Sequence, residues 1–388
     1  MSCPKCREAA RFVGYRTKTT VSLLGPIRLR RAYYHCKACR SGFCPWDEVL
    51  DLDNSDTTPA AREVASMAGA VEAFGQAATF LKRMSGVRLS ESSVQRTSEA
   101  VGADIGRRLA AGETFGEAAD WGWHKDADGK TCAYVSIDAT GTPQQGPKGA
   151  KAEGRMCTVA MIYNPIPEDR DRWAKPDARR RPPWQARYVA SLEGQAVVGD
   201  PMRRQAAQVG MDHAERWIAL SDGGSGLEDW LRVHFSRVEA VILDFYHVSE
   251  YLADLAKAWH GAETEAAKDQ HQQWVHRLKH EGGATVLEEL RTLKLPNRKG
   301  LRECYRATLV YFENQVHRMD YPTYRAHGWQ IGSGPVEAAC KTVINRRLKG
   351  TGMRWGPDGA DAMSHLRALY VSEPSQWSAY WSSRSRAA

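Results

Sequence analysis

Two Cys-x-x-Cys pairs near the N-terminus constrain the fold of this chain more tightly than any other local feature. The pairs are Cys3-Pro-Lys-Cys6 and Cys36-Lys-Ala-Cys39, and the residues between them read as β-strands with a turn at Gly25-Pro26. Four thiolates in two such knuckles suit tetrahedral Zn²⁺, and a site closed in this way leaves no position for water. The spacing predicts a zinc ribbon over residues 1–50 that holds one structural Zn²⁺, with Cys44 as a bystander.

The strands of this ribbon are rich in arginine, with Arg28, Arg30 and Arg31 close to Tyr33 and Tyr34. These side chains suit contacts with phosphates and bases, and they equally suit a solvated basic edge.

The whole chain carries 54 Lys and Arg against 46 Asp and Glu, and this surplus favours a polyanionic partner. No apolar run is long enough for a membrane span. Nine cysteines, with two Cys-x-x-Cys pairs, indicate metal ligation in a reducing cytoplasm.

Residues 58–118 show helical spacing and predict a DNA-binding segment of the helix-turn-helix type. Helices are expected over about residues 60–72 and 74–84, because Pro59 suits a first helical turn and apolar residues then recur at helical intervals. A further helix, capped by Ser90, would present polar side chains to base edges. The same pattern also describes helical hairpins that bind nothing. The two side chains expected to contact DNA are Gln95 and Arg96.

From residue 130 onwards, three carboxylates occupy positions that ordinary surface charge does not explain well. Asp138 ends one apolar run, Asp222 ends another, and Glu337 lies just inside a helix opened by Gly332-Ser-Gly-Pro. A single aspartate at a strand end is more often a helix cap or a turn former. The three together indicate a metal site, because carboxylate oxygens are hard ligands that suit Mg²⁺. Two such ions can clamp the attacking and leaving oxygens of a phosphodiester displacement.

The order of predicted elements over residues 130–247 is β-β-β-α-β-α-β, which is the order of a ribonuclease-H-like core. In that topology the first and fourth strands are neighbours, so Asp138 and Asp222 would face one another. Residues 248–327 are expected to form a helical insertion, and the core would resume over residues 328–372. The predicted fold class is therefore α+β and multidomain, with a zinc ribbon, a helical segment and a ribonuclease-H-like α/β catalytic core that carries a helical insertion.

Asp244 competes with Asp222 for the second carboxylate, because each follows a plausible strand. Topology favours Asp222, since the fifth strand would lie further from the first than the fourth does. Asp244 is then better placed to orient a residue or to contact DNA beside the site. His247 could share that outer role, protonate a leaving oxygen, or pair with Asp244 for structure alone.

Several stretches of the chain resemble a known family. They are Ser136-Ile-Asp-Ala-Thr-Gly, Leu220-Ser-Asp-Gly-Gly, Leu243-Asp-Phe-Tyr-His, Ile331-Gly-Ser-Gly-Pro-Val-Glu-Ala-Ala-Cys-Lys, and Arg346-Arg-Leu-Lys-Gly-Thr-Gly-Met-Arg-Trp. Together they resemble bacterial insertion-sequence DDE transposases of the Kra-type group, which is distantly similar to Mutator-like transposases. The resemblance covers nearly the whole chain, the ribbon included.

The resemblance implies an enzyme that binds the terminal inverted repeats of its own element, nicks them, and joins the freed 3′-hydroxyls to target DNA. It implies a catalytic triad of Asp138, Asp222 and Glu337 that holds two Mg²⁺ or Mn²⁺ ions, with Asp244 and His247 as accessory residues. The expected partner is double-stranded DNA, at element ends and target. The protein is expected to be a homodimer or a higher homo-oligomer in the bacterial cytoplasm, associated with the nucleoid when bound to DNA.

Basic residues beyond Glu337 form a row that could follow a DNA backbone or simply face solvent: Lys341, Arg346, Lys349 and Arg354. The segment 179–184, Arg-Arg-Arg-Pro-Pro-Trp, reads as a basic loop whose tryptophan could stack on an unpaired base.

Two other functions stay open. One is a transposase-derived DNA-binding regulator with an idle core, against which the three intact carboxylates argue. The other is a ribonuclease-H-like nuclease that cuts without strand transfer.

Overall fold

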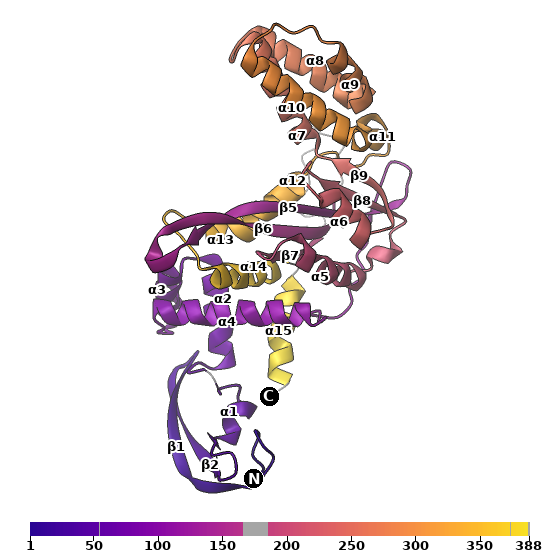
Figure 1. Cartoon of the computed structure of the whole chain (residues 1–388). Coiled ribbons are helices and arrows are strands. Elements are labelled where there is room, and N and C mark those ends of the chain that lie inside the picture. The colour runs from indigo at the N-terminus through magenta and orange to yellow at the C-terminus, as the bar shows by residue number, and fades with distance from the viewer. Residues whose placement is uncertain (54, 166–184, 373, 387–388) are drawn as a thin grey trace. The chain divides into compact units, whose positions relative to one another are not determined.

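The computed structural model describes residues 1–53, 55–165, 185–372 and 374–386, and these form a mixed α/β protein (Figure 1). The chain divides into two compact units. The first comprises Met1–Arg108 together with Trp355–Ala388, and the second comprises Leu109–Arg354. Among the described residues, no helix has the length and apolar character needed to cross a membrane.

The N-terminal part of the first unit is a cysteine module, defined here as residues 1–50. Its main elements are β1 (Ala10–Ser22) and β2 (Gly25–Cys36), which pair along their whole length as an antiparallel hairpin. The short strand β3 (Gly42–Phe43) pairs with β2, and helix α1 (Pro45–Val49) follows. The hairpin lies between the two Cys-x-x-Cys pairs, as the sequence predicts.

Three helices follow the cysteine module, namely α2 (Pro59–Val71), α3 (Phe74–Ser85) and α4 (Glu91–Ala110). The hydroxyl of Ser90 accepts a hydrogen bond from the backbone N–H of Ser93 at 3.1 Å, so it caps α4 as expected. The sequence predicts this helix over about residues 91–100. In the structure it continues to Ala110, because its C-terminal half packs within the first unit, as described next.

The first unit is completed by two C-terminal helices, α14 (Pro357–Val371) and α15 (Pro374–Arg386). Gly102 of α4 lies so close to α14 that an added Cβ would be 2.0 Å from the carbonyl oxygen of Ala362. Helix α14 therefore packs directly on α4. The sequence analysis assigns residues 328–372 to the catalytic core, whereas in the structure the second unit ends at Arg354.

The second unit is built on a six-stranded mixed sheet in the order β7-β6-β5-β8-β9, with β4 (His124–Lys125) paired to β5. β5 pairs antiparallel with β6 and parallel with β8, and β8 pairs parallel with β9. The central strands are apolar and buried on both faces, as expected for parallel strands. The remaining strands are β5 (Thr131–Gln145), β6 (Lys151–Asn164), β7 (Gln185–Ser191), β8 (Arg216–Ser221) and β9 (Val238–Leu243).

Helices α5 (Gln195–Gln208) and α6 (Leu227–His234) connect β7 to β8 and β8 to β9, so the predicted order of elements is confirmed. Two boundaries differ from the prediction. Asp138 lies inside β5 rather than at its end, because the strand continues to Gln145 by pairing with β6. Helix α5 begins at Gln195, six residues before Pro201, whereas the sequence predicts a helix over about residues 201–209.

A run of helices follows β9, as predicted for the insertion at residues 248–327. These helices are α7 (Phe245–His260), α8 (Glu265–Glu281), α9 (Gly283–Thr292), α10 (Lys299–Gln315) and α11 (Tyr321–Ala326). The indole of Trp274, fully buried among them, donates a hydrogen bond to Glu289 at 3.0 Å. Three short helical segments then follow one another directly: α12 (Gly334–Ala339), a π-helical segment at Cys340–Asn345, and α13 (Arg346–Leu348).

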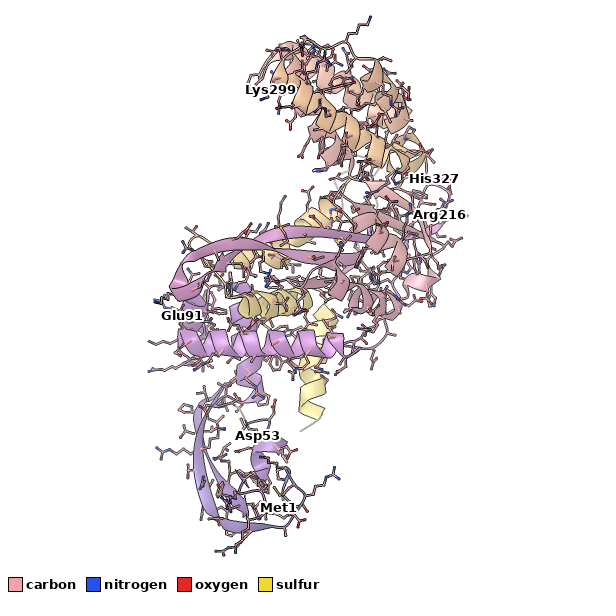
Figure 2. The ribbon with its side chains drawn as sticks, in the orientation of Figure 1. Met1, Asp53, Glu91, Arg216, Lys299 and His327 are labelled. Atoms are coloured by element: carbon pink, nitrogen blue, oxygen red, sulfur yellow. The ribbon has the colours of Figure 1, made fainter. Side chains whose placement is uncertain are left out.

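A charged cluster joins the start of β8 to the turn after β4 and to the segment that follows α11. Arg216 lies 2.6 Å from Asp126 and 2.7 Å from Asp128, and His327 lies 2.7 Å from Asp128. Figure 2 labels Arg216 and His327, which lie close together. The indole of Trp329 also donates to Asp126, at 3.1 Å. This cluster ties the return of the helical insertion to the sheet, at the end of β8 opposite to Asp222.

Candidate functional site

Three aspartates lie in a row where the parallel pairing of β5, β8 and β9 ends. Ser136 pairs with Leu220, and Ser221 pairs with Leu243. Continuing both registers places Asp138 beside Asp222, and Asp222 beside Asp244. Asp222 and Asp244 are the first residues after their strands, so the structure brings three of the carboxylates that the sequence indicates to the same edge of the parallel strands.

Asp138 is half-buried and lies in an electrostatic environment shared with two other carboxylates. One of its oxygens accepts the backbone N–H of Ala139 at 2.7 Å, and the other lies 3.5 Å from the thiol of Cys340. Burial raises the pKa of Asp138, and the negative charges of Asp222 and Glu337 raise it further. Asp222 and Glu337 therefore each repel Asp138, and a bound divalent cation would relieve this repulsion.

Asp222 follows β8, and one of its two carboxylate oxygens accepts a hydrogen bond from the protein. Its Oδ1 accepts the N–H of Gly224 at 2.8 Å, and its Oδ2 has no hydrogen-bond partner among the residues that the structure describes. Arg318, which is 1% exposed, donates to the carbonyl oxygens of Ser221 at 3.2 Å and Asp222 at 3.3 Å. The same guanidinium donates to the carbonyl of Val241 at 3.3 Å. Arg318 therefore links the C-terminal ends of β8 and β9 through hydrogen bonds to their carbonyl oxygens, next to Asp222.

Asp244 differs from Asp222, because both of its carboxylate oxygens are occupied and its side chain is 2% exposed. Its Oδ1 caps α7 by accepting the N–H of Tyr246 at 3.0 Å. Its Oδ2 accepts the hydroxyl of Ser333 at 2.6 Å. Asp244 therefore links the end of β9 to the segment that precedes α12.

Glu337 projects from α12 and is only partly buried, with its side chain 48% exposed. Its Oε1 lies 3.5 Å from the hydroxyl of Ser333, and its Oε2 lies 3.7 Å from the ammonium of Lys341. The approach to α12 is tight, since a Cβ on Gly332 would lie 2.7 Å from the Tyr246 ring. A glycine at position 332 therefore lets this segment pack against the start of α7.

The spacing of the carboxylates is wider than that of a single closed ion site. Among the described residues, the only group of three or more potential ligands within 4.8 Å of one another is formed by the four cysteines. Asp138, Asp222 and Glu337 are thus close enough to interact electrostatically without surrounding one point.

His247 does not contact Asp244 in any interaction that the described residues make. Its Nδ1 lies 3.5 Å from Glu250, and its ring lies edge-on to Tyr251 and Tyr311. Those two tyrosine rings stack at 4.0 Å. Tyr311 in turn covers the turn after Asp222, because a Cβ on Gly223 would lie 2.5 Å from its ring.

Four residues near the site escaped the sequence analysis: Tyr311, Arg318, Ser333 and Cys340. Ser333 and Cys340 lie within the motif around Glu337, so their closeness to Glu337 in the sequence could have indicated that they lie near the site. Tyr311 and Arg318 belong to the helical insertion, where they look like ordinary helix-surface residues. No local pattern separates them from their neighbours.

The four cysteines of the two Cys-x-x-Cys pairs form one cluster, as the spacing predicts. The sulfur atoms of Cys3 and Cys39 are 3.5 Å apart, and those of Cys6 and Cys36 are also 3.5 Å apart. Cys44 is buried outside this cluster, just before α1. The cluster could bind a structural metal such as zinc.

The residues proposed to contact DNA are mainly exposed. Arg96 is exposed on α4, and the neighbouring Gln95 is hydrogen-bonded to Glu99 at 2.9 Å. Lys341 and Arg346 are exposed after Glu337. Lys349 donates to the hydroxyl of Thr140 at 2.7 Å, and Arg354 donates to the carbonyl of Gly149 at 3.3 Å, so this part of the chain follows the β5–β6 hairpin. The basic segment 179–184 lies outside the described residues.

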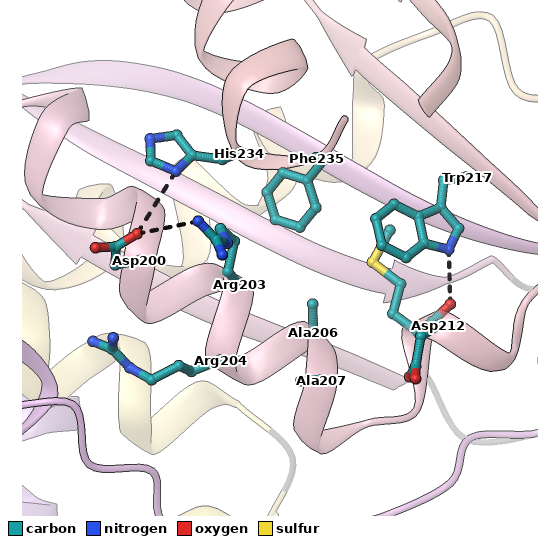
Figure 3. Close-up of a pocket in the computed structure, with 10 residues that line it drawn as sticks. Asp200, Arg203, Arg204, Ala206, Ala207, Asp212, Trp217, His234 and Phe235 are labelled. Carbon is teal, nitrogen blue, oxygen red and sulfur yellow. Dashed lines mark hydrogen bonds and ion pairs between the residues drawn. The ribbon is translucent and has the colours of Figure 1, made fainter. Parts of the chain in front are cut away.

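A pocket of about 540 Å³ lies elsewhere in the second unit, between α5, β8 and α6 (Figure 3). Asp200 lies 3.6 Å from Arg203 and 4.0 Å from His234 in its wall. The indole of Trp217 donates to the carbonyl of Met211 at 2.8 Å. None of the residues selected from the sequence lines this pocket, so it is separate from the row of aspartates.

A scan against protein-family models and a search of curated proteins each find no match to this chain. The functional interpretation therefore rests on the geometry of the site and on the residue patterns.

Proposed function

We propose that this protein is a DDE transposase, which binds the terminal inverted repeats of its insertion sequence and catalyses metal-dependent DNA cleavage and strand transfer. The observation that carries this proposal is the register of β5 and β8, which places Asp138 beside Asp222 at the end of the parallel strands, where Asp138 also interacts electrostatically with Glu337. Three carboxylates from distant parts of the chain are costly to bring together without a cation.

The strand order supports a ribonuclease-H-like core for this site. The first three strands of the unit-2 sheet, β5, β6 and β7, form an antiparallel series, and β8 and β9 extend it in parallel from β5. The order along the sheet is thus third, second, first, fourth, fifth. In this arrangement the first and fourth strands are neighbours, which is the relation that the proposed ligand set requires.

The hydrogen bonds around the two competing aspartates favour Asp222 as a metal ligand. Asp244 is 2% exposed, and an ion bound there would have to share or replace the bonds by which its two oxygens cap α7 and hold Ser333. Asp222 keeps one oxygen available. We therefore assign metal binding to Asp138, Asp222 and Glu337, and a positioning role to Asp244.

The residues present fit Mg²⁺ or Mn²⁺, because all three proposed ligands are carboxylates and Glu337 is open to solvent. Two such ions, when bound, would activate the attacking hydroxyl and stabilise the leaving oxygen. The protein's own contribution is to hold the carboxylates in place. Asp244 and Ser333 orient the helix of Glu337, and Arg318 fixes the turn of Asp222.

The proposed DNA contacts divide between the two units. Gln95 and Arg96 on α4 would supply sequence preference, while Lys341, Arg346, Lys349 and Arg354 would neutralise phosphates. The zinc proposed for the cysteine cluster would be structural. We also propose that the active form is a homodimer or higher homo-oligomer, because strand transfer of one element requires both of its ends.

The test uses a plasmid that carries the DNA flanking the coding region. Wild-type protein is expected to nick or cut this DNA with added Mg²⁺ or Mn²⁺ and to produce joined products, whereas Asp138→Asn binds the DNA without cutting it. The matched control is Asp229→Asn, which changes an exposed aspartate on α6. Metal is omitted rather than chelated, since a chelator would also strip zinc.

The outcomes separate the competing functions. Joined products support a transposase, and cutting without joining identifies a nuclease. Binding with no cutting at any divalent-metal concentration identifies a DNA-binding regulator. Equal activity in wild type and Asp138→Asn would remove the assignment of this site.

A further inference from the structure

The positive charge of the chain is concentrated in the cysteine module. Residues 1–50 contain ten Lys and Arg against three Asp and Glu, whereas the other residues contain 44 against 43. Strands β1 and β2 contain six Lys and Arg and no acidic residue. The module therefore accounts for nearly all of the surplus charge, and it is one part of the protein that would attract a polyanion.

One face of the β1–β2 hairpin is covered by α1 and by the segment that follows it. Arg31 forms a buried ion pair with Asp47 of α1, and Lys18 donates to the carbonyl of Leu52 at 2.6 Å. Arg16 lies over the ring of Tyr33, 3.4 Å from its centroid. Arg31 and Tyr33, which the sequence analysis selects as possible nucleic-acid contacts, thus belong to this covered inner face.

The opposite, outer face of the hairpin carries exposed aromatic and basic side chains beyond Tyr34, which itself stacks on Phe43 at 5.9 Å and packs against the buried cysteines. Residues directly opposite in an antiparallel pair share a face, so Phe12 shares this face with Tyr34. Phe12 is 45% exposed and Tyr15 is 60% exposed. Their rings lie 5.5 Å apart, and Phe12 lies 5.7 Å from Tyr34. The result is a continuous row of rings along the strand direction.

Arginines extend this row toward the tip of the hairpin. Arg30 lies over the ring of Tyr15, 4.3 Å from its centroid, and Arg28 is exposed two residues further along the same face. Within the described part of the first unit, no hydrogen bond or ring contact joins Phe12, Tyr15, Arg28 or Arg30 to an element beyond the hairpin. The outer face is therefore an open surface with cations and planar rings side by side.

We propose that the outer face of the β1–β2 hairpin binds single-stranded DNA, with Phe12 and Tyr15 stacking on bases and Arg28 and Arg30 contacting phosphates. Stacked aromatic rings beside cations are the general device for holding unpaired nucleic acid. A duplex hides the faces of its bases, so it would use the arginines and leave the rings in water. Exposed rings in this position therefore favour an unpaired strand over a duplex.

This inference extends the proposed function, since cutting and joining element ends generates unpaired strands. It does not depend on catalysis, because the hairpin lies in the first unit and the proposed metal site in the second. The two proposals can therefore fail separately, and binding is measured without any added divalent metal.

The experiment measures fluorescence anisotropy of the full-length protein with a labelled oligothymidine and with a duplex of equal length, across a salt titration. Phe12→Ala/Tyr15→Ala is expected to weaken binding to the single strand about 10-fold or more, while Phe12→Tyr/Tyr15→Phe preserves it. Arg28→Ala/Arg30→Ala should reduce the salt slope for the single strand by about 1.4.

The matched control is Lys5→Ala/Lys37→Ala, which removes two exposed positive charges from the knuckles instead of the outer face. Zinc content and circular dichroism of each variant show whether the module is intact. Unchanged single-strand binding in a folded Phe12→Ala/Tyr15→Ala variant would overturn the inference, as would an equal loss in the control. Duplex cleavage by the same variants reports separately on the proposed enzyme.

Discussion

Ser333 donates a 2.6 Å hydrogen bond to Asp244, and the two residues are 89 positions apart in the chain. Asp244 directly follows β9, and Ser333 immediately precedes the helix that carries Glu337. This buried bond therefore sets where Glu337 stands relative to the sheet. A charge-assisted hydrogen bond of this kind is worth about 1.5–3 kcal/mol, which is enough to hold a short helix in one position.

The first prediction concerns the two competing aspartates. Asp222→Asn is expected to abolish metal-dependent cleavage while DNA binding stays nearly intact, because a direct ligand is lost. Asp244→Asn and Ser333→Ala should each cost about 10- to 100-fold, because they disturb only the placement of Glu337. Cleavage and gel-shift assays across a metal titration make the comparison. Abolished cleavage in Asp244→Asn together with an active Asp222→Asn would reverse the assignment.

The second prediction is that Arg318 acts on the site through Asp222. Arg318→Lys removes the forked guanidinium that bonds the ends of β8 and β9, so half-maximal cleavage should require about 10-fold more Mn²⁺. The matched control is Arg306→Lys, an exposed position on α10. Metal titration and thermal denaturation are measured together. A lower melting temperature with an unchanged metal requirement would show that Arg318 serves stability alone.

The third prediction concerns the cysteine cluster. Cys36→Ser/Cys39→Ser is expected to lose tightly bound zinc and to unfold the module, because four thiolates make the closed site. Cys44→Ser should retain one zinc per chain, since Cys44 lies outside the cluster. Elemental analysis of the purified proteins measures the zinc bound per chain. Wild-type protein without zinc, or full zinc in the double variant, would contradict the assignment.

The fourth prediction uses the ion cluster around Asp126, whose side chain is 1% exposed. Burial opposes ionisation of this carboxyl, yet hydrogen bonds from Trp329, the backbone of Lys130, and Arg216 lower its pKa overall. A lowered folded-state pKa contributes stability above the unfolded value of about 3.9, and this contribution is lost as the pH falls through the folded pKa.

Asp126→Asn should therefore lower the stability of the second unit by about 2–4 kcal/mol near neutral pH. The difference from wild type should shrink as the pH falls below about 4. Thermal denaturation between pH 3 and 7 provides the measurement, with Asp229→Asn as a control at an exposed position. A difference that stays constant over this range would show that the ionised carboxylate is not the source of the stability.

The fifth prediction concerns base recognition by α4. Arg96→Ala should reduce discrimination between element ends and random duplex more than it reduces overall affinity, because base contacts specify while phosphate contacts position. Arg83→Ala, an exposed arginine on α3, is the control. Competition binding with specific and random duplexes gives both quantities. An equal loss on the two DNAs would mean that Arg96 contacts only the backbone.

Local sequence patterns predicted much of the framework. The sequence pattern predicts the fifth strand of the core over residues 238–243, and β9 has these same bounds, because the apolar run lies between the polar residues Arg237 and Asp244. The cap at Ser90 and the four-cysteine cluster were also predictable, since both depend on spacing over a few residues or on a strict ligand chemistry. The row of Asp138, Asp222 and Asp244 followed from strand order together with register.

What the sequence by itself determined was the identity and order of the elements and the residues able to bind metal. Only the tertiary structure decided how those residues are used. The full length of β5, the two hydrogen bonds that occupy Asp244, and the place of Arg318 beneath Asp222 each depend on partners elsewhere in the fold. Such partners leave no periodic trace in the sequence, because the packing of the whole unit brings them together rather than any local backbone preference.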